Sequence, residues 1–135
     1  MNSATESSGP EFLDLSGVRI LVVEDSWQLG KAIASLLTSL GAEVSGPVAT
    51  SADAEYLVVQ QPPDAALVDF NLRGGELADG LIERLHQLGI HVIVTTGYTE
   101  LPGVGQRAAV ILHKPLTEAA LLGSLRPVVA RKVPR

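Results

Sequence analysis

Several residue types are absent or scarce in this chain, and each absence removes a class of protein. The 135 residues include no cysteine, so neither disulfide bonds nor thiolate metal sites can form. No apolar run approaches the ~20 residues that span a bilayer, so we expect no membrane segment. Residues 1–10 are polar and lack the basic start and apolar stretch of a secretory signal. Together these absences predict a cytoplasmic protein.

Basic residues are also scarce. The chain has 10 lysines and arginines against 15 acidic residues, which gives a formal net charge of -5. An excess of negative charge disfavours direct binding to nucleic acid through a basic face. The cations near the C-terminus are interpreted as a solvated helix end and tail; they are Arg126, Arg131, Lys132 and Arg135.

Hydrophobic residues make up 46% of the chain, which indicates a folded core and, at this length, a single domain. Residues 1–16 are rich in Asn, Ser, Thr, Glu and Gly and are interpreted as a flexible N-terminal arm, with Phe12, Leu13 and Leu15 holding its end against the body. We expect the folded domain to span residues 17–130 and a basic tail to span residues 131–135.

Five apolar segments, several of them rich in β-branched residues, alternate with helical patterns. The predicted strands are Val18–Val23, Ala42–Val48, Ala65–Asp69, Ile90–Thr95 and Ala109–Leu112. Ser26, Thr50 and Thr117 are candidate N-caps of helices, and Gly41 and Gly89 are candidate ends. This alternation predicts an α/β fold with a five-stranded, doubly wound parallel sheet.

Proline and glycine interrupt the helical pattern in the last third of the chain. The third helix has apolar positions from Leu77 to Leu88, and Pro127 is expected to disturb the last helix. Pro102, Gly103 and Gly105 lie between the fourth and fifth strands. Since proline and glycine disfavour helix interiors, we expect a short or irregular fourth helix and mobility over residues 99–107.

Polar residues follow the predicted strands at their carboxyl ends: Glu24, Asp25, Asp69, Thr96 and Lys114. Because parallel strands share one carboxyl edge, these side chains are expected to converge in a crevice. Three carboxylates repel one another without a counterion, and Mg²⁺ prefers oxygen ligands of this kind. The backbone carbonyl of Asn71 could add another oxygen. The sequence therefore predicts a magnesium site here.

The remaining two groups suit phosphoryl chemistry. The Lys114 ammonium could neutralise an anion beside Asp69, and the Thr96 hydroxyl could donate to one of its oxygens. This set indicates nucleophilic attack by the Asp69 carboxylate on phosphorus, which yields an acyl phosphate.

Five short motifs in this order resemble the receiver domain of two-component response regulators, over about residues 18–129. They are Val-Glu-Asp at 23–25, Leu-Val-Asp at 67–69, Asn-Leu at 71–72, Thr-Gly at 96–97 and Lys-Pro at 114–115. The resemblance implies a flavodoxin-like fold and phosphorylation of Asp69 by a sensor histidine kinase. It also implies that Glu24, Asp25 and Asp69 hold Mg²⁺ with the Asn71 carbonyl, and that Thr96 and Lys114 sense the phosphoryl group.

In this family the domain is no turnover enzyme: it assists its own phosphorylation and dephosphorylation and signals by conformational change to a protein partner. Ile111 stands where most receivers have Tyr or Phe, so we do not expect the usual aromatic switch. The segment through Thr96, Gly97 and Tyr98 is similar to the single-domain subgroup with a Phe-Ala-Thr-Gly-(Gly/Tyr) motif, whose members often partner HWE-type kinases. Val94 and Thr95 replace its first two residues.

Other interpretations remain. The chain could be a pseudo-receiver, a phosphorylation-independent interaction module that keeps the fold. A haloacid-dehalogenase-like phosphatase also forms an aspartyl phosphate, but Asn71 stands where its second aspartate would serve as the acid. The three histidines have no metal-binding spacing and are expected to have surface roles: His86, His91 and His113. Trp27 is expected to be partly exposed and to pack in the core or at its rim, with contact to a partner as the alternative.

Overall fold

The computed structural model describes residues 13–97 and 107–132, and the predicted strands form one sheet in it. The strands are β1 (Arg19–Val23), β2 (Glu43–Val48), β3 (Ala65–Asp69), β4 (His91–Thr96) and β5 (Val110–His113). They pair in the order β2-β1-β3-β4-β5, and every pairing is parallel. The prediction of a five-stranded parallel sheet is confirmed.

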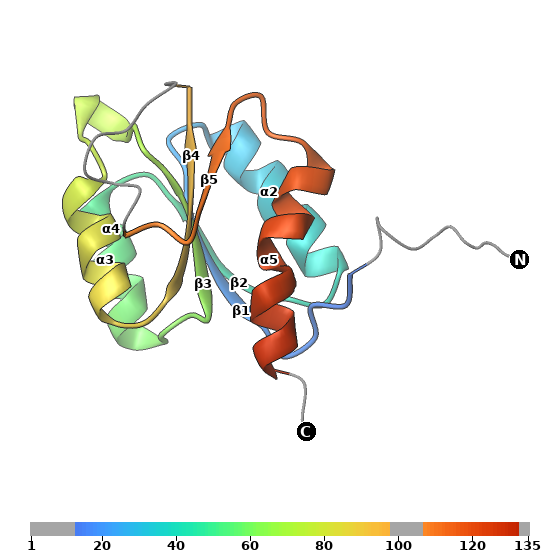
Figure 1. Cartoon of the computed structure of the whole chain (residues 1–135). Coiled ribbons are helices and arrows are strands. Elements are labelled where there is room, and N and C mark those ends of the chain that lie inside the picture. Colours follow the sequence, from blue (N-terminus) through green and yellow to red (C-terminus); the bar gives the residue numbers. More distant parts are fainter. Residues whose placement is uncertain (1–12, 98–106, 133–135) are drawn as a thin grey trace, which may run out of the picture.

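Helices cover both faces of this sheet. They are α2 (Trp27–Ser39), α3 (Ser51–Gln60), α4 (Asp79–Gln87) and α5 (Glu118–Lys132), and a short 3₁₀ turn, η2, spans Arg73–Gly75. Helices α2 and α5 lie on one face of the sheet, and α3 and α4 lie on the other (Figure 1). The fold is therefore doubly wound, as the alternating pattern predicts. None of the helices in the described part of the chain is long and apolar enough to cross a bilayer.

The core has two layers, because neighbouring residues of a strand point to opposite faces of the sheet. In β1, Ile20 and Val22 pack with α2 and α5, whereas Leu21 and Val23 pack with α3 and α4. Leu13 and Leu15 are buried in the α2 and α5 layer. These two residues hold the end of the N-terminal segment against the body, as expected, whereas Phe12 lies outside the described residues.

Three predicted N-caps are confirmed by hydrogen bonds that satisfy backbone donors at helix starts. The Ser26 hydroxyl accepts from the Leu29 N–H at 3.2 Å, and the Thr50 hydroxyl accepts from the Asp53 N–H at 3.2 Å. The Thr117 hydroxyl accepts from the Ala120 N–H at 3.1 Å. Local sequence thus determines where these helices begin.

Two helix boundaries differ from the prediction. Helix α4 begins at Asp79, so Leu77 precedes it; Leu88 follows its last residue, and both leucines are exposed. Helix α5 continues past Pro127 to Lys132, so Arg131 and Lys132 are helical and not part of a tail. Burial of Leu125 and Val128 on either side of the proline outweighs the cost of its missing N–H. The predicted fourth helix falls largely on residues 98–106, outside the described residues.

Strand β2 contains a bulge at Gly46, where its register against β1 shifts between Leu21 and Val23. Gly46 has φ +93°, and a Cβ there would lie 2.5 Å from the Val22 carbonyl oxygen. We therefore expect Gly46→Ala to lower the free energy of unfolding by about 2 kcal/mol or more. Gly80 of α4 has open space at its Cβ position, so Gly80→Ala is the matched control and should be neutral or stabilising. Equal urea midpoints for the two variants would contradict this account.

Candidate functional site

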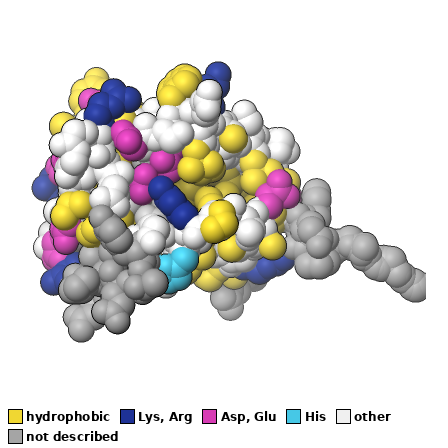
Figure 2. Space-filling view, turned by 90° about the horizontal axis from the view of Figure 1, so that it is seen from above, with side chains coloured by type: hydrophobic (Ala, Val, Ile, Leu, Met, Phe, Trp, Pro, Cys, Tyr) yellow, Lys and Arg dark blue, Asp and Glu magenta, His cyan; other side chains and the backbone are white. Residues whose placement is uncertain are grey.

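The carboxyl edge of the sheet gathers the polar residues that follow the strands. Glu24 follows β1, Asp69 is the last residue of β3, Thr96 ends β4, and Lys114 follows β5. Figure 2 looks onto this edge and shows acidic side chains beside a basic side chain near the centre of the face. The parallel topology thus brings together residues that lie far apart in the sequence.

Asp69 is the centre of the site and is only 4% exposed. Its Oδ1 lies 3.3 Å from the Lys114 Nζ and accepts a hydrogen bond of 3.3 Å from the Asn71 N–H. A buried carboxylate needs such partners, because removal from water without compensation is costly. The backbone N–H of Lys114 donates a hydrogen bond of 2.8 Å to the backbone carbonyl of Thr96. This bond fixes the backbone from which the Lys114 side chain extends.

Glu24 is the second buried carboxyl group of the site, at 6% exposure. Its pKa is raised from the ordinary 4.5 to about 7, chiefly by burial and in addition by the negative charge of Asp69 and a hydrogen bond with Asp69. The hydrogen bond from the Ser26 N–H to Oε2, 3.0 Å long, and the Lys114 charge oppose this shift. The two carboxyl groups therefore compete for one proton or one cation.

Asp25 does not join this pair. Half of its side chain is exposed, and its Oδ1 lies 3.9 Å from the Arg73 Nε. Within residues 13–97 and 107–132, no three His, Cys, Asp or Glu side chains are grouped closely enough to hold a metal ion. Two of the three expected carboxyl groups, Glu24 and Asp69, lie together here, and Asp25 lies at the rim. Its side chain faces the Arg73 guanidinium and the solvent instead of Asp69.

The threonines and Asn71 lie at the same edge. Thr95 and Thr96 are both buried, and Thr95 pairs with Asp69 across the sheet while Thr96 pairs with His113. Asn71 contacts Asp69 through its N–H; the role of its carbonyl stays a prediction. Ile111 is half-buried against the α3 and α4 layer.

Two residues of the site were missed by the sequence analysis. Ser26 has the predicted cap, but its N–H also holds the Glu24 carboxylate. Arg73 in η2 pairs with Asp25, and a single arginine in a glycine-rich loop gives no signal of such a partner. In both cases the contact depends on a turn that periodicity does not describe.

Two further expectations hold only in part. The His91 Nε2 lies 2.9 Å from the Ser124 carbonyl oxygen, so this half-buried histidine links β4 to α5 as well as reaching the surface. Trp27 is 61% exposed at the start of α2, with the Lys31 Nζ 5.5 Å from its ring centroid, and does not pack in the core.

The arrangement has the parts of a nucleophilic acceptor site. Asp69 offers a carboxylate oxygen, Lys114 offers a fixed positive charge beside it, and Glu24 offers a second carboxyl group. Preorganised charge of this kind stabilises negative charge that develops in a transferring group.

By sequence, the chain matches no family profile and no curated protein. Its structure is similar to the receiver domain of the response regulator PhyR from Erythrobacter litoralis, with a TM-score of 0.76 and 25% identity over 89% of this chain and 96% of that one. It is also similar to the receiver domain of TorR, the response regulator of the TMAO respiratory system, with a TM-score of 0.74 and 26% identity over 84% and 98%. A CheY-like receiver domain from Methylobacillus flagellatus gives a TM-score of 0.73 at 22% identity over 82% and 98%. The chain therefore has the fold of the CheY-like receiver domains of response regulators.

Proposed function

We propose that this chain is a cytoplasmic receiver that accepts a phosphoryl group from a sensor histidine kinase on Asp69. The observation that supports this most strongly is the buried Asp69 carboxylate, 3.3 Å from the Lys114 ammonium at the carboxyl edge of the sheet. A carboxylate nucleophile next to a fixed positive charge is the pair that phosphoryl transfer to an aspartate uses. The proposed output is a conformational change read by a protein partner.

In the proposed transfer, an Asp69 oxygen attacks the phosphorus of a phosphohistidine in line with the leaving nitrogen. The new P–O bond forms as the P–N bond breaks, and the imidazole nitrogen keeps the electron pair and takes a proton from solvent. Lys114 neutralises charge on the phosphoryl oxygens, and Thr96 donates a hydrogen bond to one of them. The product is an acyl phosphate on Asp69.

The residues present fit Mg²⁺ in kind. This ion usually binds through one or two carboxylates with several waters, and Glu24 and Asp69 supply two buried carboxyl groups in contact. We propose that Glu24, Asp69 and Asp25 would hold the ion together with the Asn71 carbonyl. For this, Glu24 releases its proton and Asp25 exchanges its contact with Arg73. When bound, Mg²⁺ supplies positive charge that balances the carboxylates and the incoming phosphoryl oxygens.

The pseudo-receiver is the second candidate function, because Asp25 faces Arg73 and only two carboxyl groups converge. Intact-mass analysis after incubation with acetyl phosphate separates the two. A receiver gains one phosphoryl group with Mg²⁺ and none with excess EDTA. A chain that stays unmodified under both conditions, while still folded by circular dichroism, would establish the pseudo-receiver.

We propose an HWE-type kinase as the donor of the phosphoryl group. The support is the Thr-Gly-Tyr segment at 96–98, which is similar to the motif of receivers that often partner such kinases. We expect faster transfer from a phosphorylated HWE-type kinase than from a kinase of another type at equal concentration. Equal rates would remove the support for this donor class.

Lys114→Met removes the cation beside Asp69 and should slow phosphoryl uptake from acetyl phosphate by about 10²-fold. The methionine keeps the length of the side chain and removes the charge that balances the phosphoryl oxygens. Lys31→Met is the matched control, since Lys31 is exposed on α2 and contacts the Trp27 ring. Equal uptake rates for the two variants would show that Lys114 has no part in the transfer.

A further inference from the structure

A cavity of about 610 Å³ lies at the edge of the sheet opposite Asp69. It is formed where α3, α4 and the last turn of α5 meet, beside the residues that directly precede β3 and β4. Strand β3 separates the two sites: Asp64 directly precedes it and Asp69 ends it, which places their Cα atoms about 16 Å apart. The cavity is therefore distinct from the proposed phosphorylation site.

Most of the cavity wall is apolar. The apolar side chains that line it include Val58, Val59, Pro62, Pro63, Leu88 and Val128. Val59 and Leu88 are among the most exposed large hydrophobic residues of the described chain, at 73% and 55%. A concave site of a few hundred cubic ångströms with an apolar wall is typical of small-molecule sites. Its volume suits one compact ligand better than a protein segment.

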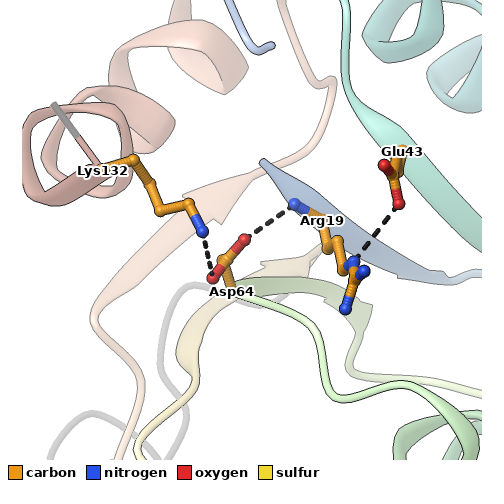
Figure 3. Close-up of polar contacts among 4 residues, drawn as sticks. All are labelled: Arg19, Glu43, Asp64 and Lys132. Carbon is orange, nitrogen blue, oxygen red and sulfur yellow. Dashed lines mark hydrogen bonds and ion pairs between the residues drawn. The ribbon is translucent and has the colours of Figure 1, made fainter. Parts of the chain in front are cut away.

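The charged residues of the wall leave a positive surplus. Glu55 pairs with Arg84 at 3.8 Å, and the Asp64 Oδ1 pairs with the Lys132 Nζ at 3.4 Å. The other Asp64 oxygen accepts the Arg19 N–H at 2.8 Å, so this carboxylate is held between β1 and α5 (Figure 3). Both carboxylates are thus neutralised.

Arg131 is the third cation of the wall and makes no ion pair within residues 13–97 and 107–132. Its guanidinium can form two parallel hydrogen bonds with a carboxylate. A positive surplus at this cavity contrasts with the net charge of -5 of the whole chain. The wall therefore complements an anion that also has an apolar body.

We propose that this cavity binds a small amphipathic carboxylate, with its apolar body between α3 and α4 and its carboxylate on Arg131. The probes are anilinonaphthalene sulfonate, an apolar anion whose fluorescence rises in such a site, and decanoate as a competitor. We expect saturable binding of one probe per chain and displacement by decanoate. Decanol, which has the same chain length without charge, should compete at least several-fold more weakly.

Two exposed substitutions test the assignment without disturbing the core. Val59→Glu places a negative charge at the lip and should weaken probe binding at least tenfold. Arg131→Gln should weaken the binding of decanoate several-fold and leave the binding of decanol unchanged. Leu77→Glu is the matched control, because Leu77 is exposed but lies outside this cavity. This variant should bind the probe with the affinity of the wild type.

The alternatives give opposite results. The proposed site would be overturned if the probe showed no saturable binding, or if Val59→Glu and Leu77→Glu lost the same amount of probe affinity. Equal competition by decanoate and decanol would overturn the role of Arg131. Asp69→Asn should bind the probe as the wild type does, so this inference can fail or succeed independently of the proposed phosphorylation.

Discussion

Asp69→Asn is expected to abolish phosphoryl uptake from acetyl phosphate and from a phosphorylated kinase. The amide keeps the shape of the side chain, and its oxygen can still accept the Asn71 N–H, so the fold should persist. The amide oxygen is a poor nucleophile and cannot form a stable acyl phosphate. Intact-mass analysis with Mg²⁺ measures the effect as loss of the phosphoryl adduct.

The control for this prediction is Asp53→Asn. Asp53 is an exposed aspartate in the first turn of α3, and its substitution makes the same chemical change away from the crevice. It should take up a phosphoryl group at the rate of the wild type. Uptake that survives in Asp69→Asn would place the acceptor at another residue.

Glu24→Gln is expected to raise the stability of the metal-free protein at high pH. The folded protein holds a proton on Glu24 up to about pH 7, whereas the unfolded chain releases it near 4.5. Stability from this group is thus fully present below 4.5 and is lost as the pH rises through 7. Glutamine has no charge to bury and can still accept the Ser26 N–H, so the variant avoids this loss.

Urea unfolding in EDTA at pH 5 and pH 8 measures the effect. The stability difference between Glu24→Gln and the wild type should shift in favour of the variant by about 1 to 3 kcal/mol between these two conditions. Glu43→Gln is the control, because Glu43 is an exposed partner of Arg19. A Glu24→Gln difference that does not change with pH would contradict the assignment of the proton to Glu24.

The same titration predicts how Mg²⁺ binding depends on pH. Below pH 7, binding must release the Glu24 proton, so the Kd of the wild type should fall about tenfold for each pH unit and level off above 7. Trp27 is two residues from Asp25 and is exposed, so its fluorescence can report the binding. Glu24→Gln should bind Mg²⁺ weakly, with a Kd that does not change with pH in this range.

Much of the fold follows from local patterns. The apolar runs of β1, β3 and β4 are buried on both faces, and this is why their sequences lack alternation. The N-caps at Ser26, Thr50 and Thr117 depend only on residues close in the sequence, so they can be predicted from it. The course of α5 through Pro127 could not be predicted, because packing of Leu125 and Val128 decides it.

The site was predictable to the extent that topology determines it. Residues at strand ends must share the carboxyl edge, so the approach of Lys114 to Asp69 follows from the order of the sheet. The direction of Asp25 depends on the turn after β1 and on Arg73, a contact between two loops. The cavity beside Arg131 depends on how three helix ends meet, and no motif encodes that.

The central claim is that the Asp69 side chain becomes an acyl phosphate, and reductive trapping tests it most directly. The protein is treated with acetyl phosphate and Mg²⁺, reduced with borohydride, digested, and sequenced by mass spectrometry. We predict homoserine at position 69 and at no other aspartate. Reduction at a different aspartate, or none in a protein that remains folded, would contradict the claim.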